Sequence, residues 1–172
     1  MADYQEIRSN VPISATYLIP SGANNYAALD VIADSTSAPT VLTFSGCGRD
    51  LAGSGYIVKA RMFTDQKTFT GRIKLHLFHT SPTAINDNSP YLLLYANNSK
   101  GIGTITFPAA ATEDPTNSTA ANAFVVPDGI SLPMSYKCDA NSQALYGIVE
   151  VLDIFTSAAT QNFWFELTCD QN

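Results

Sequence analysis

The chain has 172 residues, a formal net charge of −6 and a sequence pI of about 4.6. That length suits one domain with a real core, and an acidic chain with dispersed Lys and Arg lacks the basic surface that binds phosphate backbones, so we expect no nucleic-acid partner. No apolar run approaches the ~20 residues of a membrane-spanning helix, and no secretory signal is visible at the start of the sequence. We therefore expect no membrane partner and synthesis in a cytoplasm.

Apolar and polar residues alternate along much of the chain, which is typical of strands with one buried face. The clearest case is the run in which Ile73, Leu75 and Leu77 alternate with charged and polar side chains. The candidate strands, in chain order, are residues 11–19, 26–32, 40–44, 56–63, 70–79, 102–107, 123–126, 132–137, 145–155 and 163–168. Within residues 145–155, Gly147 is expected at a β-bulge.

The segments between the candidate strands are rich in turn-forming residues. Residues 45–55 contain four glycines and are expected to form a loop, as is the Ala/Thr/Asn-rich segment 108–122. Ser89 followed by Pro90 resembles a helix N-cap with proline at the first helical position. We therefore expect one or two helical turns over residues 91–96.

These elements predict an all-β fold, an antiparallel β-sandwich of jelly-roll-like type with about nine or ten short strands and one short helix. Because there is no internal repeat and no break in composition, residues 1–172 are expected to form a single β-sandwich domain, with residues 1–10 as an N-terminal docking arm. The expected core positions lie on the apolar side of alternating strands and include Ile73, Leu75, Leu77, Val149, Phe163 and Phe165.

The three cysteines, Cys47, Cys138 and Cys169, show no C-x-x-C spacing. In a chain made in a reducing cytoplasm they are expected to be free thiols. Cys138 and Cys169 could face each other across strands, which the sequence leaves open. Cys47 lies between two glycines, but no catalytic signature links it to a histidine, so an inert thiol is expected there.

His76 and His79 are the only histidines. Residues i and i+3 of a strand point to opposite faces, so this pair cannot hold a metal ion from one regular strand. Both are expected to be surface or half-buried side chains, and Asp87 could approach His79 through the intervening loop.

No motif in the sequence indicates catalysis. The nucleophile elbow Gly-x-Ser-x-Gly is absent, since Ser54 lies in Ala-Gly-Ser-Gly-Tyr. The carboxylates that stand out lie in a polar loop, in turns or near the C-terminus, and they are Glu113, Asp114, Asp128, Asp139 and Asp170. Neighbouring carboxylates in a polar loop are not the acid–base pair that a glycosidase holds across a cleft. We therefore expect no catalytic, cofactor-binding or metal-binding residues, and no enzymatic activity.

The last candidate strand ends the chain with alternating aromatic residues. Phe163 and Phe165 share one face and are expected in the core, which places Trp164 on the opposite face. For Trp164 we expect a cross-strand or subunit contact, with an exposed sugar platform as the alternative.

Several segments between residues 56 and 168 form a larger pattern. They are a strand ending in Met62-Phe63, the hairpin Thr64-Asp-Gln-Lys-Thr, Gly71-Arg-Ile-Lys-Leu-His-Leu-Phe, Gly101-Ile-Gly-Thr-Ile-Thr-Phe, Leu145-Tyr-Gly-Ile-Val-Glu-Val and Phe163-Trp-Phe-Glu-Leu. The most specific piece is Leu-x-Leu-Phe-x-x-x-Pro-Thr-x-Ile-x-Asp-Asn at residues 75–88. Together they resemble the jelly-roll-like decoration (cement) proteins of tailed-bacteriophage capsids.

The resemblance implies a non-enzymatic structural protein of the virion, synthesised in the cytoplasm of the bacterial host. It would bind the outer face of the shell formed by the phage major capsid protein and stabilise it, as a homo-oligomer, with a homotrimer expected from the threefold symmetry of the shell. The charged fraction of 14% suits a surface partly covered by other subunits. The irregular segments 1–10, 45–55 and 108–122 are the expected contacts with the shell or a neighbour.

Two other classes of function stay open. A carbohydrate-binding or host-attachment β-sandwich, such as a head fibre or tail adhesin, would use exposed Tyr and Trp together with Asn and Asp. A capsid-borne glycosidase or esterase would need a paired acid and base, which the sequence does not show.

Overall fold

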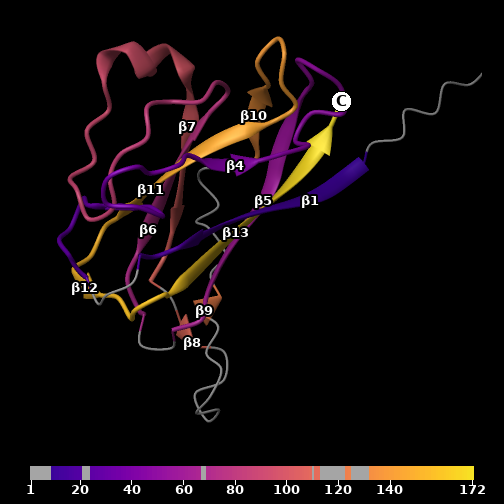
Figure 1. The fold of residues 1–172 in the computed structure, drawn as a ribbon. Helices are drawn as coiled ribbons and strands as arrows, with labels where there is room; N and C mark the ends of the chain where they lie inside the picture. Colours follow the sequence, from indigo (N-terminus) through magenta and orange to yellow (C-terminus); the bar gives the residue numbers. More distant parts are fainter. Residues whose placement is uncertain (1–8, 21–23, 67–68, 110, 113–122, 125–131) are drawn as a thin grey trace, which may run out of the picture.

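The computed structural model describes residues 9–20, 24–66, 69–109, 111–112, 123–124 and 132–172. Two antiparallel sheets pack against each other (Figure 1). The first sheet runs in the order β1 (Ser9–Leu18), β13 (Asn162–Gln171), β5 (Ser54–Thr64) and β10 (Met134–Lys137). In the second, β3 (Val31–Ile32) and β4 (Leu42–Phe44) line one side of β11 (Leu145–Val151), followed by β6 (Ile73–Phe78) and β7 (Gly101–Phe107).

Smaller elements complete the described part of the chain. β2 (Asn25–Tyr26) pairs with β12 (Phe155–Thr156), β8 (Ala111–Thr112) pairs with β9 (Ala123–Phe124), and η1 (Tyr95–Lys100) is a short 3₁₀ helix. No helix within the described ranges is long and apolar enough to cross a bilayer.

The order of the strands is that of a jelly roll. When β3 and β4 are counted as one interrupted strand, the two large sheets contain eight strands, and their orders in chain numbering are 1-8-3-6 and 2-7-4-5. This arrangement places two Greek keys in one sandwich. The prediction of an all-β antiparallel sandwich with one short helix is confirmed.

The core lies between the sheets and follows the period-two pattern. Along β13, Phe163, Phe165 and Leu167 are fully buried while their neighbours are half-exposed. The rings of Phe107 and Phe165 meet across the two sheets, with centroids 5.9 Å apart. The predicted core is confirmed at every position, with exposures of 1% or less for Ile73, Leu75, Leu77, Val149, Phe163 and Phe165.

Two predicted strands are wrong because each is interrupted. The backbone turns between β2 and β3, where the Asp30 carboxylate accepts a hydrogen bond from the Ala27 amide at 2.7 Å and Leu29 adopts a φ of 75°. The later strand ends at Val151, although the Leu152 amide still donates to the Arg72 carbonyl at 2.9 Å. The chain then forms β12, which pairs with β2 instead of the main sheet.

The expected bulge at Gly147 is also wrong. The pairing of β11 with β6 runs through Gly147 without a shift in register. Glycine is required there by packing, because an added Cβ would lie 2.8 Å from Leu75 Cδ1 and 3.3 Å from Phe44 Cε2. The small residue lets the inner side chains of neighbouring strands approach β11.

The short helix begins four residues later than predicted. Ser89 accepts a hydrogen bond from the Val31 amide at 2.9 Å, and Pro90 forms a bridge with Asp30, so both continue an extended segment instead of starting a helix. Residues 45–53, by contrast, form the predicted loop before β5. Most of the docking arm at residues 1–10, and residues 110 and 113–122 of the segment 108–122, lie outside the described residues.

Candidate functional site

The long crossover between β6 and β7, residues 79–100, is anchored by backbone hydrogen bonds to the segment that includes β3. The Asn88 amide donates to the Val31 carbonyl and the Val31 amide to the Ser89 carbonyl, both at 2.9 Å. The Tyr91 amide donates to the Leu29 carbonyl at 2.7 Å. Residues 88–91 of the crossover are therefore bonded to residues 29–31, which gives the part of the crossover after Tyr91 a fixed base.

Asp87 holds the crossover in place through buried hydrogen bonds. The residue is 3% exposed, and its carboxylate accepts hydrogen bonds from the Tyr26 hydroxyl at 2.8 Å, the Ala33 amide at 2.9 Å and the Asn24 side-chain amide at 3.2 Å. Burial raises the pKa of the Asp87 carboxyl, and these donors oppose that rise by stabilising its ionised form. Asp87, near the end of the motif at residues 75–88, thus has a structural role. We call its hydrogen bonds with Tyr26 and Ala33, which hold the crossover to the rest of the fold, the Asp87 clasp.

An apolar cluster lies beneath the same segment. Ile85 packs against buried residues of the second sheet that point away from the main core, namely Val31, Ala33, Phe78 and Ile148. The isoleucine and the aspartate of the motif therefore act together, one through packing and the other through hydrogen bonds.

His76 supports Tyr91, which precedes the most exposed part of the crossover. The His76 and Tyr91 rings are stacked with centroids 4.0 Å apart, and His76 Nε2 lies 2.7 Å from Glu150 Oε2. Lys74 Nζ reaches the same carboxylate oxygen at 3.1 Å. Burial lowers the pKa of His76, although the Glu150 carboxylate opposes this. His76 is therefore bound into a structural cluster.

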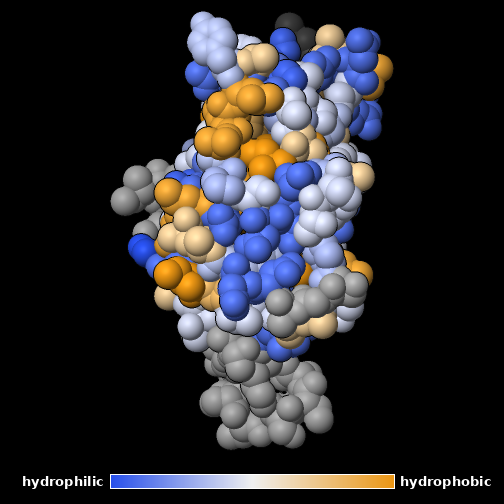
Figure 2. All heavy atoms as spheres, turned by 60° about the vertical axis from the view of Figure 1, so that its left-hand side comes forward, coloured by the Kyte–Doolittle hydropathy of each residue, from blue (hydrophilic) through white to orange (hydrophobic). Residues whose placement is uncertain are grey.

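Beyond Tyr91 the crossover exposes four consecutive residues, which we call the apolar ridge. Leu92, Leu93, Leu94 and Tyr95 are 70%, 38%, 53% and 92% exposed. Beside the ridge is an open groove of about 300 Å³, lined in part by Ile85, Pro90, Leu92 and Leu94. Hydrophobic side chains gather on this side of the molecule (Figure 2). Scattered exposed leucines are ordinary, but a contiguous apolar patch marks an interaction surface.

The last residue of the crossover, Lys100, bonds to residues near its start and so holds the ridge in place. Lys100 Nζ donates to the Ser81 carbonyl and to Asn97 Oδ1, each at 3.0 Å. The His79 amide donates to the Lys100 carbonyl at 2.9 Å, which closes the loop. The ridge is therefore presented on a hydrogen-bonded frame.

The ridge is also free of charge. Residues 88–99 contain no Asp, Glu, Lys or Arg. Covering such a surface with a partner would desolvate no ion, and the centres of protein interfaces are depleted in charge and enriched in tyrosine. The residue types of the ridge are therefore those of a protein-binding surface.

His79 lies apart from the ridge, beside a pocket of about 380 Å³ that Lys137 and Asp139 also line. Its Nδ1 is 2.9 Å from the Thr80 hydroxyl, which donates to Asp139 at 2.6 Å. That hydrogen bond lowers the pKa of Asp139. The expected approach of Asp87 to His79 is wrong, because Asp87 binds Tyr26 and its neighbours. Among the described residues no group of three or more potential ligands is placed to hold a metal ion.

The three cysteines are free, as predicted, and the structure places all three in the interior. The hydrogen-bonding neighbour of Cys169 is Cys47, which the sequence did not suggest, whereas Cys138 borders the pocket beside His79. Of the remaining candidates, Ser54 begins β5, and Asp170 lies in β13, where its Oδ1 is buried and has no hydrogen-bond partner among the described residues. Glu113, Asp114 and Asp128 lie outside the described residues.

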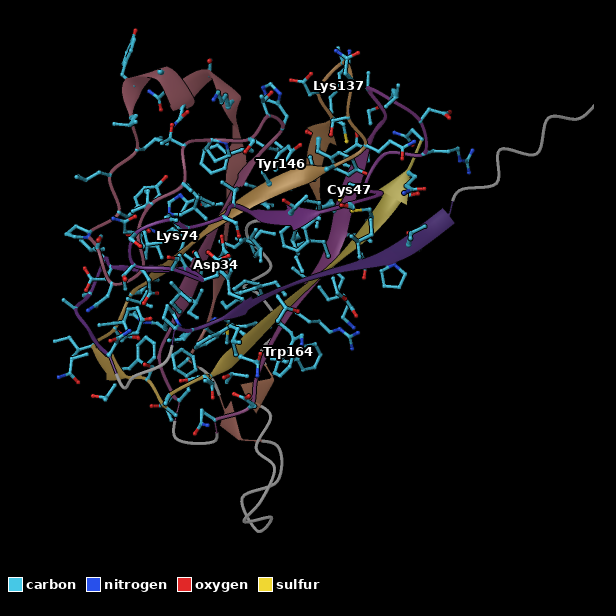
Figure 3. All side chains as sticks on the ribbon, viewed as in Figure 1. Asp34, Cys47, Lys74, Lys137, Tyr146 and Trp164 are labelled. Carbon is cyan, nitrogen blue, oxygen red and sulfur yellow. The ribbon has the colours of Figure 1, made fainter. Side chains whose placement is uncertain are left out.

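Trp164 lies on the outer face of the first sheet, where Figure 3 labels it on β13. It is half-exposed and directly opposite Phe63 of β5, which is the register that the expected cross-strand contact requires. The Arg61 guanidinium lies 5.3 Å from the centre of the Phe63 ring and pairs with Glu166. This face therefore combines aromatic and charged groups.

No family model matches the chain, and no curated protein matches it. The apolar ridge is therefore the candidate functional site. Sequence reasoning overlooked it, although one signal was available: three consecutive leucines between two tyrosines, in a segment without charge.

Proposed function

We propose that this chain is a structural decoration protein of a tailed-bacteriophage capsid. It binds the outer face of the major capsid shell, stabilises that shell and catalyses no reaction. It acts as a homotrimer, and the apolar ridge supplies the main contact with the capsid protein. The chain is made in the host cytoplasm and ends on the surface of the virion.

The exposed, uncharged ridge is the observation that carries the proposal. Removing Leu92, Leu94 and Tyr95 from water would favour binding, because apolar surface gains about 25 cal/mol per Å² when it is buried. The hydrogen-bonded frame below the ridge reduces the ordering entropy that binding would otherwise cost. A protein that must stay attached to a shell needs such a preformed contact and no catalytic group.

The fold and the sequence pattern give further support. Jelly rolls are used by viral capsid and lectin domains, although a fold alone does not specify a function. The segment at residues 75–88, which carries the resemblance to decoration proteins, contains the Asp87 clasp at the base of the ridge. The pattern and the candidate contact surface thus belong to one structural unit.

The experiment uses phage heads that lack this chain and the purified full-length protein. Bound copies per head are counted by quantitative mass spectrometry, and their position is seen by electron microscopy. We expect a fixed number of copies on the outer surface, at least tenfold weaker binding for Leu92→Asp, and unchanged binding for Ile154→Asp. Ile154 is a matched control because it is 79% exposed and borders a different turn. Absence of the protein from heads would refute the proposed function.

A carbohydrate-binding or host-attachment role is the second candidate, favoured by the outer face of the first sheet. Trp164 and Phe63 lie side by side there, and the Arg61–Glu166 pair adds polar groups next to them. Sugar sites combine an aromatic platform with hydrogen-bonding groups. Glycan-array binding that is lost in Trp164→Ala but kept in Leu92→Asp would favour this role over decoration.

A further inference from the structure

Two buried cysteines from different parts of the chain meet at one end of the sandwich. Cys47 follows β4 of the second sheet, Cys169 lies in β13 of the first, and each is 0% exposed. Figure 3 labels Cys47 near this end of β5 and β13. Gln171, two positions after Cys169 on the same face of β13, donates to the Gly46 carbonyl at 2.7 Å and to the Cys47 carbonyl at 3.1 Å. Residue 47 is therefore held over the part of β13 that carries Cys169.

The side chains of the pair are also in contact. The Cys47 thiol is a hydrogen-bonding neighbour of Cys169, and this contact lowers the pKa of Cys169 and raises the pKa of Cys47. The Tyr136 hydroxyl donates to the Cys47 carbonyl at 2.5 Å, which further fixes residue 47 at this end of the sandwich. A thiolate, the nucleophilic form of cysteine, that forms within this pair is therefore stabilised by the neighbouring thiol.

We propose that Cys47 and Cys169 form an intramolecular disulfide when the folded protein meets a small-molecule disulfide such as glutathione disulfide. The Cys169 thiolate attacks one sulfur of glutathione disulfide, which forms a mixed disulfide and releases one glutathione thiolate. Cys47 then loses its proton and attacks the Cys169 sulfur, which releases the second glutathione thiolate. Two protein thiols are oxidised, one glutathione disulfide is reduced to two glutathione molecules, and the two protons pass to these.

The bond would tie the segment after β4 to the last strand, and so join the two sheets. A disulfide stabilises a fold more when it closes a long loop, and most of the chain lies between Cys47 and Cys169. Because both thiols are buried, the reaction waits for local opening and is slow. A chain that folds in a reducing cytoplasm and later enters an oxidising medium would be strengthened after folding. This inference does not depend on the proposed function.

Cys138 provides an internal control. It is 4% exposed, borders the pocket beside Lys137 and His79, and lies close enough to Cys169 to interact with it electrostatically, but without the hydrogen-bonding contact that Cys47 makes. If exposure alone governed oxidation, Cys138 would react first. If the contact between Cys47 and Cys169 governs it, Cys138 stays free.

The test incubates the reduced full-length protein with glutathione disulfide, with and without a low urea concentration that promotes local opening. Samples are quenched with N-ethylmaleimide, the free thiols are counted after denaturation, and linked peptides are mapped by mass spectrometry. We expect the thiol count to fall from three to one, a Cys47–Cys169 peptide, and a rise in Tm of about 10 °C.

Cys138→Ala should cross-link in the same way. Cys47→Ala should stop at a mixed disulfide between Cys169 and glutathione, because the thiol that resolves it is missing, and should show no internal cross-link. Three free thiols after prolonged incubation under both conditions would overturn the proposal. So would a linked peptide that contains Cys138, or mixed glutathione adducts that never resolve. The linked peptides of the wild-type protein show which cysteines are joined, so the proposal is tested even if a variant fails to fold.

Discussion

The hydroxyl of Tyr26 donates a hydrogen bond to the carboxylate of Asp87 at 2.8 Å, across 61 positions of sequence. The Tyr26 ring is stacked on Phe155 with centroids 4.7 Å apart, so the bond joins the β2–β12 pair to the crossover that carries the apolar ridge. The presentation of the ridge thus depends on a buried polar contact far from it in sequence.

Replacing Asp87 with alanine should destabilise the protein by about 2–4 kcal/mol, because the Tyr26 hydroxyl and the Ala33 amide would be left buried without an acceptor. Asp87→Asn keeps the shape and one acceptor oxygen, so its loss should be smaller. Urea denaturation monitored by circular dichroism measures both. Asp153→Ala is the control, since Asp153 accepts its hydrogen bonds from the backbone amide and guanidinium of Arg72 at the exposed surface and should cost clearly less. Equal losses for Asp87→Ala and Asp153→Ala would contradict the clasp.

Gly147 and Leu75 should be energetically coupled. Gly147→Ala places a Cβ 2.8 Å from Leu75 Cδ1 and should cost about 1–3 kcal/mol through overpacking. Leu75→Ala leaves a cavity and should cost about 2–5 kcal/mol. In the double variant the new methyl group enters that cavity, so the combined loss should be smaller than the sum by about 1 kcal/mol or more.

The control for this cycle is Gly101→Ala, where an added Cβ meets nothing closer than 3.5 Å. It should change stability little on its own and add independently to Leu75→Ala. Strict additivity of Gly147→Ala with Leu75→Ala would show that the two positions do not share packing space.

The strands and the inward-facing side chains were predictable because they depend on local alternation. Ile73, Leu75 and Leu77 needed only a period of two and one buried face, and the structure places them as expected. The break at residues 27–30 was not predictable, because it depends on Asp30 capping a turn and on Leu29 at positive φ, where leucine is uncommon.

The candidate site was less predictable than the fold. From the sequence, residues 92–94 are equally compatible with a buried helical turn and with an exposed ridge, because three consecutive leucines do not indicate whether other parts of the chain cover them. Their exposure is decided by the backbone bond from Tyr91 to Leu29 and by the Asp87 clasp. Both are contacts between segments far apart in sequence. The meeting of Cys47 with Cys169 has the same origin.

The stability of the protein should fall as pH decreases from 7. The folded-state pKa of His76 lies below the ordinary value of 6.5 because burial disfavours its charged form. Below pH 6.5 the unfolded chain therefore binds a proton that the folded chain resists, and stability is lost until the pH reaches the folded-state pKa. Urea denaturation at intervals between pH 7.5 and pH 5 should reveal this slope.

The matched variant His76→Gln removes the titrating group at the same position. It should be less stable than the wild type at pH 7, because it loses the stack on Tyr91, but its stability should vary less between pH 7 and pH 5. An identical pH slope in the two proteins would show that His76 does not contribute to it.

Binding through the apolar ridge should depend little on salt. Residues 88–99 contain no charged side chain, so raising the ionic strength from 0.1 to 1 M shortens the Debye length from about 10 Å to about 3 Å without weakening an attraction at the contact. Apolar burial is insensitive to simple electrostatic screening and is strengthened by sulfate. Titration of heads that lack the chain should therefore give dissociation constants within about threefold of each other at the two ionic strengths, with tighter binding in sulfate. A fall of tenfold or more in affinity at 1 M NaCl would show that charged groups outside the ridge make the main contact, because screening weakens only interactions between charges.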